Sequence, residues 1–81
     1  MPTYPFSDKQ SNDGVENAFT YHPPTGNQAE RYEELRERGK HLARLMLNFC
    51  PPSRELSLAL TKLEESIMWA NASIARNETG E

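Results

Sequence analysis

Two adjacent prolines interrupt a long helical pattern, and this interruption constrains the fold more than any other feature of the chain. Proline cannot continue a helix and holds the preceding residue extended, so a helix has to end before Pro51 and Pro52. Ser53 follows directly and is a favourable N-cap, while Asn27 and Glu30 have the spacing of a capping box. The sequence therefore predicts helices over residues 27–48 and 54–76, joined by a connector short enough to make them an antiparallel hairpin.

Apolar residues in both predicted helices recur at steps of three and four, which is the pattern of a packed seam. A glycine on this seam costs about 1 kcal/mol of helix propensity. It either permits a close approach of the two helices or marks a weak point. The fold class predicted is all-α, with these seam residues: Tyr32, Leu35, Gly39, Leu42, Met46 and Phe49 in the first helix, and Leu56, Leu60, Leu63, Ile67, Ala70 and Ile74 in the second.

The segment before the first helix has neither a helical nor a strand period. Residues 1–26 contain four of the six prolines. This composition predicts an irregular N-terminal arm over residues 1–26, a helical hairpin domain over 27–77 and a tail over 78–81.

The second helix has apolar side chains on two sides. At about 100° per residue, Leu58, Met68, Trp69 and Ala72 fall on the side away from the seam. A hairpin covers only one of these sides, so the other needs a second subunit, the arm or both. A chain of 81 residues with one cysteine, Cys50, also has little core and no intrachain disulfide. We therefore expect a homo-oligomer with these four residues at its interface, and the same face is also able to line a ligand pocket.

Charge and motif content exclude several classes of function. A net charge of -3 with nearly neutral helices is not the basic footprint of a DNA-binding protein. The densest apolar stretch, residues 42–49, is far shorter than the roughly 20 residues of a membrane span. A single thiol is typical of a reducing cytosol. No metal, phosphate-loop or nucleophile motif is present, so we expect no enzyme, no catalytic residue, no metal and no cofactor.

Several basic residues are candidates for binding phosphate groups. Arg36, Lys40 and Arg44 follow one another at i, i+4 and i+8. Such a row is either a solvated face paired with neighbouring glutamates or a set of cations that holds phosphates. Arg54 lies beside the N-terminus of the second helix, where free N–H groups also favour anions.

The run "PPSRELSLALTKLEESIMWANASIAR", preceded by "YHPP" and "YEELRERGKHLARLM", resembles the small phage proteins built on the Acb/Tad hairpin domain. These are the anti-CBASS and anti-Thoeris sponge proteins, and the resemblance covers residues 19–77. It implies a homo-oligomer, typically a hexamer, in the cytoplasm of the infected bacterial host. Such a protein sequesters cyclic di- or trinucleotides, or a cyclic ADP-ribose isomer, without cleaving them.

By position in the motif, the resemblance places Tyr21, Arg36 and Arg76 in a pocket between protomers. Arg54 is a weaker match in "SRE", and Lys40 is retained from the basic row. Two alternatives stay open at this point. One is an oligomeric scaffold or protein-interaction hairpin without a small ligand, and the other is a helix-turn-helix DNA binder, against which the long, nearly neutral helices argue.

Overall fold

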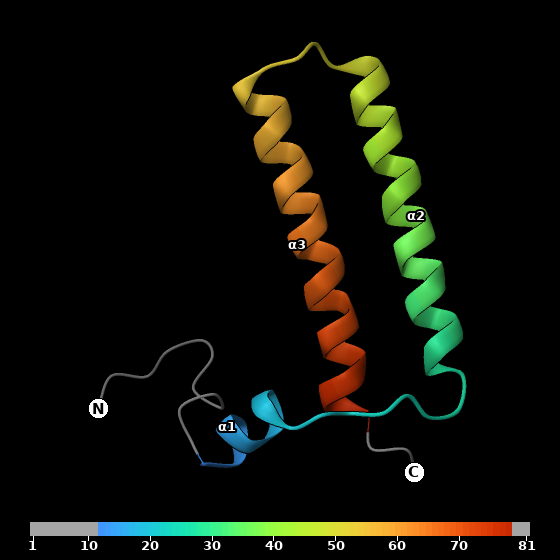
Figure 1. Ribbon diagram of the computed structural model, residues 1–81, viewed down its shortest axis with the longest axis vertical. Coiled ribbons are helices and arrows are strands. Elements are labelled where there is room, and N and C mark those ends of the chain that lie inside the picture. Colours follow the sequence, from blue (N-terminus) through green and yellow to red (C-terminus); the bar gives the residue numbers. More distant parts are fainter. Residues whose placement is uncertain (1–11, 79–81) are drawn as a thin grey trace.

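The computed structural model describes residues 12–78, which form three helices and no strand. The helices are α1 (Asn12–Phe19), α2 (Gln28–Phe49) and α3 (Arg54–Asn77). Figure 1 shows α2 and α3 as an antiparallel pair joined by a short turn, with α1 and the chain after it at the open end of the pair. The predicted all-α hairpin is therefore confirmed, and the predicted helix ends are correct to within one residue.

The short helix α1 differs from the expectation of an irregular arm. It has eight residues, none of them buried, and a helix of this length is not stable alone in water. Two polar contacts hold its end: Asn17 Nδ2 donates to the Arg76 carbonyl at 3.0 Å, and His22 Nε2 lies 2.8 Å from the Asn17 carbonyl. Such contacts leave no periodic signal in the sequence. The rest of the arm and tail predictions, for residues 1–11 and 79–81, lies outside the described residues.

The two long helices begin in different ways. Ser53 caps α3 as predicted, because its Oγ accepts a hydrogen bond from the Leu56 N–H at 3.0 Å. The predicted capping box of α2 is wrong, since the Asn27 side chain makes no cap hydrogen bond. Instead, Gln28 closes the turn before the helix: its N–H donates to the Thr25 carbonyl and its Oε1 accepts from the Thr25 N–H, both at 3.0 Å.

Gly39 permits the close approach of α2 and α3. The glycine is buried, and a Cβ placed on it would lie 2.8 Å from Cγ1 of Ile67.

Beyond Gly39, the residues of α2 that face α3 differ from the predicted seam. Leu42 and Phe49, predicted to lie on it, are 43% and 79% exposed, whereas Ala43 and Met46 are half-buried. A straight helix with 3.6 residues per turn drifts away from a seven-residue repeat, and this drift moves the contact face from residue 42 to residue 43.

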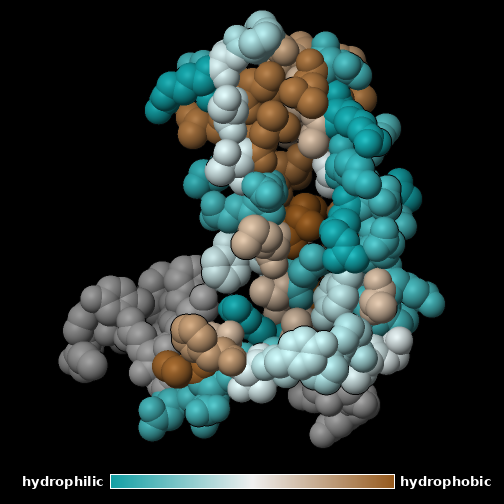
Figure 2. Space-filling view, in the orientation of Figure 1, coloured by the Kyte–Doolittle hydropathy of each residue, from teal (hydrophilic) through white to brown (hydrophobic). Residues whose placement is uncertain are grey.

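The hairpin forms a single layer of helices. The molecule measures 45 × 37 × 15 Å, and one helix with its side chains is already about 10–12 Å thick. Within residues 12–78, Leu56 is the only buried apolar side chain and none is fully buried. Apolar side chains gather openly over the turn end of the hairpin (Figure 2). A stable domain usually has two packed layers, so this chain alone leaves much apolar surface in water. No helix in the described range has both the length and the hydropathy of a membrane span.

Candidate functional site: a pocket at the open end of the hairpin

A pocket of about 390 Å³ lies where the arm meets the first turns of α2 and the last turns of α3. Its size falls within the range of small-molecule sites, roughly 300–1,000 Å³. The pocket is shallow and largely open to solvent. Its lining comes from three segments: Ala18, Thr20, Tyr21 and His22 from the arm, Tyr32 and Arg36 from α2, and Asn71, Ala72, Ala75 and Arg76 from α3.

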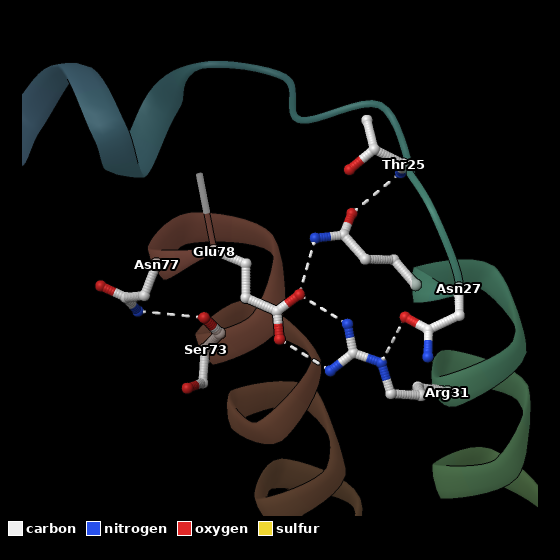
Figure 3. A network of polar contacts seen from close by, with 7 residues as sticks. Thr25, Asn27, Arg31, Ser73, Asn77 and Glu78 are labelled. Carbon is white, nitrogen blue, oxygen red and sulfur yellow. Dashed lines mark hydrogen bonds and ion pairs between the residues drawn. The ribbon is translucent and has the colours of Figure 1, made fainter. Parts of the chain in front are cut away.

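A polar clamp at the open end of the hairpin fixes the segments that build the pocket. Arg31 donates to both carboxylate oxygens of Glu78, from Nη1 at 2.7 Å and from Nη2 at 2.5 Å, and Gln28 Nε2 donates to the same carboxylate at 3.0 Å. Figure 3 shows Arg31 and Glu78 pointing toward one another across the space between α2 and α3. The hydrogen bonds from Arg31, and then from Gln28, lower the pKa of Glu78 to about 2. The clamp therefore ties the first turn of α2 to the residue after α3.

The charged side chains that line the pocket in the described part of the chain are two arginines. Arg36 and Arg76 line it, and within residues 12–78 no carboxylate does. Arg36 pairs with Glu33 at 2.9 Å, but both side chains are more than half exposed, and such a pair contributes at most about 1 kcal/mol. The guanidinium carbon of Arg76 lies 5.9 Å from the ring centre of Trp69, on the same helix. Both arginines are therefore able to face an anion at little cost.

The structure brings together three of the five predicted ligand-binding residues. Tyr21, Arg36 and Arg76 line the same pocket, although they come from the arm and two different helices. Lys40 and Arg54 do not line it. Lys40 pairs with Glu37 at 3.3 Å, and Arg54 begins α3 at the other end of the hairpin. The binding roles of all five stay predictions.

The predicted oligomer interface divides into two parts. Leu58, Met68 and Trp69 are exposed, at 44%, 64% and 52%. Ala72 is half-buried and forms part of the pocket wall. Through the contact of Arg76 with Trp69, the exposed apolar face adjoins the pocket. A copy of the chain packed on that face would therefore stand next to the pocket, and the interface stays a prediction.

Tyr32 and Asn71 are among the pocket residues that the sequence does not predict. The helical pattern places Tyr32 on the seam and indicates no role for Asn71. Both carry a buried polar atom without a hydrogen-bond partner, namely the Tyr32 hydroxyl and Asn71 Oδ1. The available signal was the antiparallel register, which places the first turns of α2 beside the last turns of α3. Among residues 12–78, no group of three histidine, cysteine or acidic side chains is arranged to hold a metal ion.

A family model described as "Acb2/Tad1, hairpin domain" matches residues 11–75, most of the chain. The chain belongs to the Acb2/Tad1 hairpin-domain family. The resemblance drawn from the sequence began at residue 19, whereas the family match begins at residue 11, so the Acb2/Tad1 hairpin domain includes α1 as well as the two long helices. Neither the curated proteins nor the solved structures gave a significant match to the chain.

Proposed function

We propose that this Acb2/Tad1 hairpin-domain protein binds cyclic di- or trinucleotide second messengers and sequesters them without cleavage. One observation carries the proposal: Tyr21, Arg36 and Arg76, which the family resemblance selects, line one pocket of about 390 Å³. Membership of the family supports the same function.

The pocket has the chemistry that such a ligand requires. Each phosphodiester of a cyclic nucleotide carries one negative charge, and an arginine fork binds it through two parallel hydrogen bonds. Arg36 and Arg76 supply two such groups from opposite helices, and none of the described lining residues is a carboxylate that would repel a phosphate. Tyr21 is 79% exposed and offers an aromatic face on which a base can stack. A cyclic ADP-ribose isomer, which also combines phosphates with a base, would use the same groups.

We further propose that the binding unit is a homo-oligomer, for which the resemblance implies a hexamer. The hairpin is one layer thick and exposes Leu58, Met68 and Trp69 along α3, and Trp69 contacts Arg76 of the open pocket. A second copy on this face would bury the apolar surface and complete the pocket wall. In the cytoplasm of an infected bacterium, stoichiometric binding by such a phage protein would lower the free messenger concentration and leave the host defence effector inactive.

Calorimetric titration and native mass spectrometry with cyclic di-AMP, cyclic di-GMP and cyclic tri-AMP test this proposal. We expect an oligomer that gains the mass of intact ligand. Arg36→Ala and Arg76→Ala should each weaken binding about ten- to a hundredfold, because a charge-assisted hydrogen bond contributes roughly 1.5–3 kcal/mol.

Arg38→Ala is the matched control. Arg38 lies on the same helix, pairs with Glu34 at 2.8 Å in the way that Arg36 pairs with Glu33, and does not line the pocket. Its loss should leave affinity unchanged. Heat denaturation of the complex followed by chromatography should return the cyclic nucleotide intact. Linear products would make the protein an enzyme. An oligomer that binds none of these nucleotides would instead favour the scaffold alternative.

A further inference from the structure

Two buried polar atoms of the described chain lack a hydrogen-bond partner, and both belong to residues of the same pocket. Within residues 12–78 these are the Tyr32 hydroxyl and Asn71 Oδ1. Tyr32 lies in the second turn of α2, and Asn71 lies two turns before the end of α3. The two long helices therefore each contribute to this pocket one residue with an unpartnered polar atom.

An unpartnered buried polar group is costly, because it has lost its hydrogen bonds to water and gained none in exchange. Most buried polar groups in folded proteins are paired, so each exception requires an explanation. Here the exceptions coincide at one pocket, next to two arginines that already favour an anionic ligand. A bound ligand that pairs with both atoms would remove the cost.

The chemistry of the two atoms indicates which part of a ligand they meet. Asn71 Oδ1 carries no proton and can only accept a hydrogen bond. A phosphodiester carries no proton to donate at neutral pH, so the partner of this oxygen is an uncharged N–H or O–H group. The Tyr32 hydroxyl both donates and accepts. An acceptor and a hydroxyl that belong to one pocket complement a nucleobase edge, which offers both an amino or imino N–H and an acceptor.

We propose that Tyr32 and Asn71 form the base-reading part of the pocket, in which Asn71 Oδ1 accepts from a base N–H and the Tyr32 hydroxyl pairs with the neighbouring acceptor. This inference rests on the proposed function and adds a division of labour to it. Arg36 and Arg76 hold phosphates, Tyr21 stacks on the base, and Tyr32 and Asn71 read the base edge. Tyr32 and Asn71 are half-buried as residues, while their polar atoms are buried, so binding as proposed requires the two side chains to rotate toward the base.

The test is to titrate Tyr32→Phe and Asn71→Leu with the three cyclic nucleotides named above and to record their melting temperatures and oligomer masses. Each variant should bind about tenfold more weakly, the usual effect of one lost hydrogen bond whose partner stays unpaired. The melting temperature should be unchanged or higher, because neither atom has a partner within the described chain. Asn48→Leu is the control, since Asn48 is exposed near the turn end of α2 and does not line the pocket.

Several results would overturn the inference. If the wild-type protein binds a cyclic nucleotide and both variants bind it with the same affinity, the base-reading role is refuted and the proposed function is unaffected. A lower melting temperature or a changed oligomer mass, again with unchanged affinity, would show that a second copy of the chain pairs with these atoms. If the variants lose affinity for the ribonucleotide ligands but not for 2′-deoxy cyclic di-AMP, the contact is to the sugar and the base assignment is wrong. A wild-type protein that binds none of the nucleotides would refute both proposals.

Discussion

Replacing Gly39 by alanine measures how much of the hairpin depends on the close approach of its two helices. The added Cβ would lie 2.8 Å from Cγ1 and 3.1 Å from Cδ1 of Ile67, and ordinary contact begins at 3.4 Å. Cγ1 is bonded directly to the Ile67 Cβ, and a β-branched side chain in a helix has one strongly preferred χ1 rotamer. The isoleucine therefore cannot swing away, and the helices have to separate by up to about 1 Å.

Two opposing terms set the size of the effect. Overpacking of this kind costs about 1–3 kcal/mol. Exchanging glycine for alanine in a helix recovers about 1 kcal/mol of propensity. We expect Gly39→Ala to destabilise the protein by about 1 kcal/mol, which lowers the melting temperature by roughly 4–8 °C in a domain of this size.

The assay is thermal unfolding followed by circular dichroism, with all variants at one protomer concentration because self-association would shift the midpoint. Ile67→Ala and the double variant complete a mutant cycle. Gly39→Ala should be neutral or stabilising in the Ile67→Ala background, where Cγ1 and Cδ1 are absent, and the difference is the coupling energy. A Gly39→Ala single variant that melts about 4 °C or more above wild type would show that only propensity matters at this position, and the argument from close approach would fail.

Two further predictions concern the clamp and the exposed face. The pKa of Glu78 is about 2 in the folded chain against an ordinary value of 4.5, so its contribution to stability is present above about pH 5 and is lost as the pH falls toward 2. The melting temperature of wild type should therefore fall more steeply than that of Glu78→Gln across this window, and parallel curves would count against the clamp. Trp69→Glu should reduce the oligomer mass in light scattering, because it places a charge on the face proposed to be buried. His41→Glu, on an exposed face of α2, should leave that mass unchanged.

The sequence by itself determined the two long helices and the turn between them. Their signals are local: Pro51 and Pro52 stop one helix, Ser53 caps the next, and apolar side chains recur at helical spacing between these points. The side of α3 that carries Trp69 was also predictable, since the angle between two residues of one helix depends only on their separation in sequence. Helix period, proline and caps act within a few residues, so they can be read without knowledge of the fold.

The tertiary structure alone decided what surrounds the pocket. The clamp joins Gln28 and Arg31 to Glu78, and α1 is held through Asn17, yet each of these contacts links residues far apart in the chain. The packing of α2 against α3 also buries the polar atoms of Tyr32 and Asn71 without giving either a hydrogen-bond partner. Hydrogen bonds of polar side chains are directional and follow no sequence period, so their partners are set by the path of the chain in space. For the same reason, the pattern of residues located the helices, and only their packing showed which polar groups line the site and lack a partner there.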